Sequence, residues 1–172
     1  MTANRMLLNI QFLLLTVFIF TGACAQKSPP ASVEKAVNGV TIKMKYNSPR
    51  VRDRIIWGDL VPYDQVWRTG ANEATILEVS KDVSIDGKKV PAGQYTLFTI
   101  PKKGEPWTVI LNTVSEQWGA YKYEEDKDLM RFTVDTERII DLEEEMTFDI
   151  NDSGNVVFTW EYMRFQFQVD AK

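Results

Sequence analysis

The sequence predicts an all-β protein, either an antiparallel β-sandwich of jelly-roll-like form or a squat barrel. Three observations support this prediction. Apolar and polar residues alternate along much of the chain, turn signals recur between the alternating segments, and no segment keeps a helical period. A strand alternates in this way when one face meets a core and the other meets solvent. We expect about nine or ten short strands in a single domain.

The predicted strands follow one another along the chain. Clear alternation or a short apolar run marks residues 40–47, 75–80, 94–100, 107–111, 130–134 and 146–150. Between them, turn residues stand at Asp86-Gly87, 91–93, 101–106 and 151–155, and the first pair tolerates the positive φ of a tight hairpin. The segment 123–129 predicts one short helical turn.

The last segment changes its phase. Apolar residues occupy even positions from Val156 to Tyr162 and odd positions from Met163 to Val169. A regular strand cannot place both sets on one face, because its side chains alternate strictly. We therefore predict a bulge or a change of sheet near residues 161–163.

The N-terminal residues predict a bacterial secretory signal. Arg5 supplies the positive region, and Phe12–Phe20 is a nine-residue apolar core, too short to cross a bilayer as a mature helix. The segment that ends at Cys24 resembles the lipobox of bacterial lipoproteins, in which the cysteine becomes the acylated first residue. Thr21 departs from that pattern, since a leucine is usual there. Ordinary cleavage near Ala23–Ala25 is the alternative.

We accordingly expect a signal peptide at residues 1–23, a flexible tether at 24–32 and one β-sandwich domain at 33–172. Acylation would also remove the only thiol of the chain from an oxidising compartment. The expected location is the cell envelope, as an outer-membrane lipoprotein or in the periplasm, with the membrane as a partner through the lipid anchor.

Composition excludes several functions. The 172 residues include no histidine, and Cys24 is the only cysteine, which removes Ser-His-Asp and Cys-His catalysis and typical zinc or copper sites. Cleavage before Cys24 would leave 19 basic and 24 acidic residues, a net side-chain charge of −5, because Arg5 alone is lost. The basic residues form no long run, so we expect no nucleic-acid partner. We expect no cofactor and no metal site, and assign no catalytic residue.

The segment "VWRTGANEAT", residues 66–75, is the first candidate site. In the structural interpretation, Gly70 supplies positive φ, Asn72 bonds nearby backbone, and Arg68 and Glu73 form an ion pair that fixes the loop. In the functional interpretation, Arg68 holds an anion while Asn72 and Glu73 bind hydroxyl groups beside the ring of Trp67.

The segment "QWGAYKY", residues 117–123, is the second candidate. Trp118 with Tyr121 and Tyr123 around a glycine would make an aromatic wall, the usual platform for sugar rings. Alternatively, these rings staple a loop across the end of a sandwich. Residues 123–128 carry oxygen donors for calcium but lack the EF-hand spacing, so a solvated acidic turn is the simpler interpretation. Residues 141–146 predict a charged strand approach that discourages edge pairing.

Five segments together resemble a bacterial family known as domain of unknown function 2911. They are "SPR" at 48–50, "WGDLVPYDQVWRTGANEAT" at 57–75, "GKKVPAGQYTLFTIP" at 87–101, "WTVILN" at 107–112 and "QWGAYKY" at 117–123. The resemblance implies a secreted or lipid-anchored β-rich domain of Gram-negative bacteria and brings no established activity. The matched motif positions are Trp67, Arg68, Gly70, Asn72, Glu73, Trp118, Gly119 and Tyr121.

Three functions follow from these observations. We expect first an exported, non-enzymatic binding module for a small polar ligand, a glycan or an envelope partner, with candidate ligand-binding residues Trp67, Arg68, Asn72, Glu73, Trp118 and Tyr121. The alternatives are an envelope scaffold without a ligand, and a hydrolase that uses Glu73 with Asp126 or Asp128 as a carboxylate pair.

Overall fold

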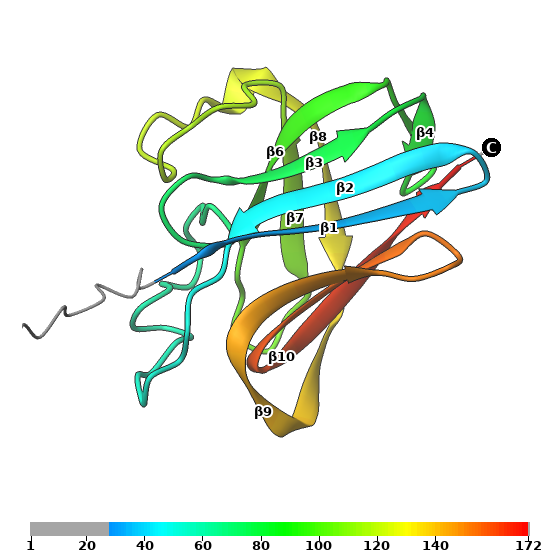
Figure 1. Cartoon of the computed structure of the whole chain (residues 1–172). Coiled ribbons are helices and arrows are strands. Elements are labelled where there is room, and N and C mark those ends of the chain that lie inside the picture. The colour runs from blue at the N-terminus through cyan, green and yellow to red at the C-terminus, as the bar shows by residue number, and fades with distance from the viewer. Residues whose placement is uncertain (1–27, 172) are drawn as a thin grey trace, which may run out of the picture.

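Two antiparallel sheets face one another in the computed structural model, which describes residues 28–171. The sheets do not close into a barrel, so the predicted all-β class is confirmed and the sandwich is the form adopted (Figure 1). The signal peptide, Cys24 and the first part of the expected tether lie outside the described residues. No helix among residues 28–171 is long and apolar enough to cross a membrane.

Six strands form the larger sheet, in the order β1-β2-β3-β6-β7-β8, and four form the smaller one, in the order β5-β4-β10-β9. Their bounds are β1 (Pro30–Val37), β2 (Val40–Asn47), β3 (Thr75–Val79), β4 (Val83–Ile85), β5 (Lys88–Val90), β6 (Gly93–Ile100), β7 (Trp107–Asn112), β8 (Asp128–Val134), β9 (Thr136–Ile150) and β10 (Asn155–Asp170). A single 3-10 turn, η1 (Glu125–Lys127), lies where the sequence predicts one.

The sheet begins earlier than the sequence suggests. Pro30 pairs with Asn47 and Ser32 with Lys45, so residues 30–32 belong to β1 and not to a flexible tether. Pro30 is tolerated there because it is the first residue of an edge strand, where its missing N–H costs no ladder hydrogen bond. The folded part therefore starts before residue 33.

The predicted irregularity in the last strand is confirmed. β10 shifts its register against β9 on both sides of Glu161, whose φ is 58°. The Glu161 carboxylate accepts hydrogen bonds from the Trp57 indole N–H at 3.1 Å and from the Tyr162 amide at 3.0 Å. The bulge lets both apolar sets of this strand reach the core, so Phe158 and Phe165 stack with ring centroids 4.6 Å apart.

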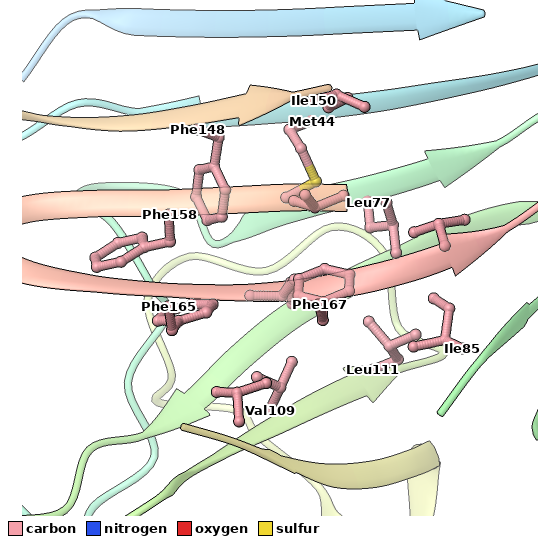
Figure 2. Close-up of a cluster of buried hydrophobic side chains, with 14 of the residues drawn as sticks. Met44, Leu77, Ile85, Val109, Leu111, Phe148, Ile150, Phe158, Phe165 and Phe167 are labelled. Carbon is pink, nitrogen blue, oxygen red and sulfur yellow. The ribbon is translucent and has the colours of Figure 1, made fainter. Parts of the chain in front are cut away.

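A continuous core fills the space between the sheets (Figure 2). β2 contributes Met44, β3 contributes Leu77 and β7 contributes Val109, all fully buried and all at inward positions of their strands. β10 faces them with its phenylalanines. Burial of this apolar area is the main stabilising term for such a sandwich.

The 27-residue connection between β2 and β3, residues 48–74, covers one end of the sandwich. The ring centroid of Trp57 lies 4.7 Å from that of Trp107 and 5.7 Å from that of Trp160. The ring of Trp67 stacks on that of Trp160, with the centroids 5.8 Å apart. Ile56 of the same connection is fully buried in the main core. Parts of this connection therefore belong to the core, while others, such as Ile55, are exposed.

A second, smaller core lies on the outer face of the larger sheet. Ala74, Phe98 and Ile110 are buried there, although Phe98 and Ile110 occupy positions that alternate with the inward residues of β6 and β7. The β7–β8 connection, residues 113–127, supplies the cover, and its Tyr123 meets Phe98 edge-on at 5.2 Å. One end of the outer face of the larger sheet is thus covered by this connection and shielded from solvent.

Candidate functional site

The two motifs singled out in the sequence meet in space. Glu73 forms an isolated β-bridge with Trp118, and the Gly119 amide donates to the Asn72 carbonyl at 3.0 Å. The next contact is the Ala74 amide, which donates to the carbonyl of Gln117 at 2.9 Å. A ladder of backbone hydrogen bonds therefore fixes the aromatic turn against the end of the β2–β3 connection.

Trp67 does not belong to this surface, in contrast to its place among the candidate ligand-binding residues. It exchanges backbone hydrogen bonds with Thr99, at 2.7 and 2.9 Å, and its ring points into the tryptophan cluster. Neighbouring residues of an extended segment point to opposite sides. Arg68 accordingly points outward, whereas the Trp67 ring packs against the core.

The turn after Arg68 contains an unusual backbone. Thr69 has φ 51° and Asn72 has φ 55°, whereas Gly70, expected to supply the positive φ, does not. A β-branched residue in this region is strained and persists only where its surroundings hold it. Here the Thr75 hydroxyl donates to the Thr69 carbonyl at 2.7 Å. Gly70 is needed for close approach, because a Cβ there would lie 3.1 Å from the Asn47 carbonyl oxygen.

The expected ion pair between Arg68 and Glu73 is absent from the described residues. The Arg68 Nε–H donates to the Gly70 carbonyl at 3.2 Å, and the Glu73 carboxylate accepts from the Asn47 side-chain amide at 3.0 Å. The short turn between them directs the two side chains to different partners. Glu73 is exposed and Arg68 is half-buried, so both retain bonding capacity toward solvent.

Two aromatic rings stand out from this surface. Trp118 is 61% exposed and Tyr121 is 84% exposed, whereas the other aromatic residues of the described chain are buried or half-buried. Gly119 between them has φ 67°, and a Cβ there would lie 3.0 Å from the Tyr121 ring and 3.4 Å from the Arg68 Nη1. The predicted aromatic wall is thus divided, because Tyr123 packs on Phe98 and serves as a staple.

Two open grooves adjoin at Glu73. One, of about 390 Å³, is lined by residues of the aromatic turn together with Glu73 and Ile76, and the other, of about 470 Å³, by the start of β1 and the end of β2. Gln117 lines the first groove and is only 9% exposed, and its Oε1 has no hydrogen-bond partner among residues 28–171. Because this atom is itself closed off from the groove, an internal water molecule is the donor that suits it.

A network beside the turn holds the loop rather than a ligand. The Asp128 carboxylate accepts from the Tyr123 hydroxyl at 2.6 Å, from the Arg131 Nε–H at 2.7 Å and from the Asn112 amide at 2.8 Å. Burial, followed by the bond to Asp128, raises the pKa of Tyr123 to about 12. With its side chain 8% exposed, Asp128 is committed to structure and is a poor member of a hydrolytic pair. The described residues include no group of three or more potential metal ligands.

The start of the described chain also lies at this surface. The Asn72 side-chain amide donates to the Ser28 carbonyl at 3.4 Å, and the Ser48 amide donates to the Pro29 carbonyl at 2.9 Å. Asn72 therefore contacts Ser28 through its side chain and the aromatic turn through its own carbonyl.

Sequence reasoning missed Gln117 and Asn47 as contributors to this surface. Gln117 stands inside the quoted aromatic motif, but its burial depends on the distant pairing with Ala74. Asn47 ends a regular strand, and no local signal links it to Glu73, 26 residues away.

The fold and this surface define an antiparallel β-sandwich with a rigid, exposed aromatic turn beside polar side chains. The chain belongs to the family described as protein of unknown function (DUF2911), whose model matches residues 28–169. No curated protein and no solved structure matches the chain.

Proposed function

We propose that this protein is an exported, lipid-anchored binding module that holds a polar ligand at the surface formed by Arg68, Asn72, Glu73, Trp118 and Tyr121. The observation that carries the proposal is the exposure of Trp118 and Tyr121 on a turn whose backbone is fixed at Asn72 and Glu73. Exposed rings on a rigid turn lose little entropy when a ligand covers them.

A glycan suits the chemistry of this surface. The C–H faces of a sugar ring pack on Trp and Tyr, which present large apolar area together with a polar tip. Hydroxyl groups of the same sugar can donate to the exposed Glu73 carboxylate, which lines the groove. Arg68 adds donors for an acidic substituent.

Two alternatives are separated by what a glycan does at this surface. If the protein is a scaffold without a ligand, an added glycan should cause no change at this surface. A hydrolase would cleave the glycan, and the groove of about 390 Å³ does carry two carboxylates, Glu73 and Glu116. Asp128, one of the partners expected for Glu73, is occupied by its three hydrogen bonds.

The test is a fluorescence titration of the purified protein with oligosaccharides from the cell envelope. Trp118 is the one tryptophan of residues 28–171 with a mostly exposed ring, so a ligand that covers it should change its emission. We expect a saturable change in the wild type and none in Trp118→Phe. A wild type without response to any saccharide would contradict the proposal and favour the scaffold, whereas released reducing ends that disappear in Glu73→Gln would favour the hydrolase.

A further inference from the structure

We infer that the aromatic surface faces the membrane that holds the lipid anchor, so that the exposed rings of Trp118 and Tyr121 lie against its headgroup layer. The inference rests on the proposed lipid anchor and adds the direction in which the proposed binding surface faces. It draws on three independent features of the molecule, which are the position of Ser28, the direction of β1 and the exposed aromatic rings.

The first feature is the short reach between the anchor and the surface. Ser28 follows Cys24 by four residues, which span at most about 14 Å when fully extended. The Ser28 carbonyl is bound by the Asn72 side chain, and the Asn72 carbonyl is bound by the Gly119 amide. An acyl group on Cys24 would therefore hold the aromatic turn within a few residues' length of the bilayer.

The second feature is the direction of the chain away from the anchor. β1 starts at Pro30 beside this surface and runs to Val37, a rise of about 23 Å. At its far end Lys35 forms an ion pair with Asp152, in the turn between β9 and β10. Figure 1 shows the start of β1 at one end of the sandwich, and the β9–β10 turn and the end of β10 toward the opposite end. The two ends thus differ in their distance from the membrane.

The third feature is the chemistry of the near end. Trp and Tyr favour the boundary between headgroups and acyl chains, because an apolar ring and a polar tip are both satisfied there. Arg68 and the exposed Lys122 stand beside the exposed Glu73 and Glu116, so the charge is mixed. The contact should therefore depend on the rings more than on anionic lipid. Because the anchor keeps the aromatic surface at a high effective concentration near the membrane, even a weak contact between the rings and the headgroups is enough to orient the domain.

Site-specific fluorescence in vesicles tests the orientation. The full chain is produced with its leader and reconstituted in phosphatidylethanolamine–phosphatidylglycerol vesicles. An environment-sensitive thiol dye is attached at Lys122→Cys or, as the control, at Asp152→Cys, both at exposed positions. Acylation of Cys24 leaves the introduced thiol as the only free one. We expect acyl-brominated lipids to quench the dye at position 122 but not at 152, in low and in high salt alike.

Each other outcome overturns a distinct statement. Equal quenching at the two positions, or quenching at neither, would overturn the membrane-facing orientation while leaving the saccharide titration to decide the binding function. An unmodified Cys24 in the intact mass would overturn the lipid anchor and the inference that rests on it. If the double variant Trp118→Ala and Tyr121→Ala loses the difference in quenching between positions 122 and 152, the contact is assigned to the two rings. If the difference persists in that variant, the role of the rings is overturned.

Discussion

At the scale of single residues, the segment from Trp67 to Glu73 divides its side chains between two duties. Trp67 and Thr69 point into the protein, where the indole stacks in the tryptophan cluster and the threonine is fully buried. Arg68 and Glu73 remain at the surface. The positive φ of Thr69 costs conformational free energy, which the buried hydrogen bonds of the turn must offset. Backbone strain of this kind is concentrated at functional positions.

The hydroxyl of Thr75 should be necessary for this turn. It is fully buried and donates to the Thr69 carbonyl at 2.7 Å, so Thr75→Val removes the donor at nearly constant volume and leaves a buried acceptor unpaired. We expect a loss of about 1 to 3 kcal/mol in the free energy of unfolding. Thr108→Val is the matched control, because Thr108 is half-buried in β7 and makes no side-chain hydrogen bond within the described chain. Urea unfolding of both variants checks this, and equal losses would contradict it.

Residue identity alone could not reveal this division. The sequence places both Trp67 and Trp118 beside glycine-containing turns, and both were reasonable candidates for a surface. One is turned inward by its backbone pairing with Thr99 and the other outward by its bridge to Glu73. These pairings join residues 32 and 45 positions apart, so they lie beyond any local pattern.

At the scale of elements, the connection 113–127 acts as a cover over the second core. Tyr123 fastens it, because its ring packs on Phe98 and its hydroxyl donates to Asp128. The exposed turn with Trp118 and Tyr121 lies on this cover. The stability of the cover therefore sets how rigidly the candidate surface is presented.

The raised pKa of Tyr123 makes this cover sensitive to alkali. The folded-state pKa of about 12 lies above the ordinary value of 10. The stabilising effect is complete below pH 10 and declines as the pH rises toward 12, because the unfolded chain releases its proton first. We expect Tyr123→Phe to lose less stability than the wild type between pH 9 and pH 11 in urea unfolding. Tyr121→Phe, an exposed phenol of the same connection, should match the wild type. A Tyr123→Phe curve identical to the wild type would refute the assignment.

Elements with a local pattern were predictable, and those formed by long-range packing were not. The phase change near Glu161 is visible in the sequence because a bulge must reverse the alternation, and the structure places it there. The Asp86-Gly87 hairpin likewise forms with φ values of 51° and 70°. By contrast, the connection 48–74 shows neither a strand period nor a helical one, because Val51, Ile56 and Val61 are buried in the core whereas Ile55 and Leu60 are exposed.

At the scale of the whole molecule, the sandwich brings the residues of the proposed binding surface together at one end. The start of β1, the β2–β3 connection and the β7–β8 connection meet there, while the two sheets provide a rigid body. Binding residues are often carried on loops that a rigid scaffold positions. Alternation, turn signals and the absence of a helical period predict the fold class, but the meeting of these three segments depends on strand order, which the sequence does not reveal.

The central claim is that Trp67 serves the fold and Trp118 serves a ligand. The melting temperatures of the wild type, Trp67→Ala and Trp118→Ala, each with and without envelope oligosaccharide, test this claim most directly. We predict that Trp67→Ala loses about 3 kcal/mol of stability. Trp118→Ala should keep its stability within about 0.5 kcal/mol but lose the ligand-induced rise that the wild type shows. Equal destabilisation by the two substitutions, or no rise in the wild type, would contradict the account.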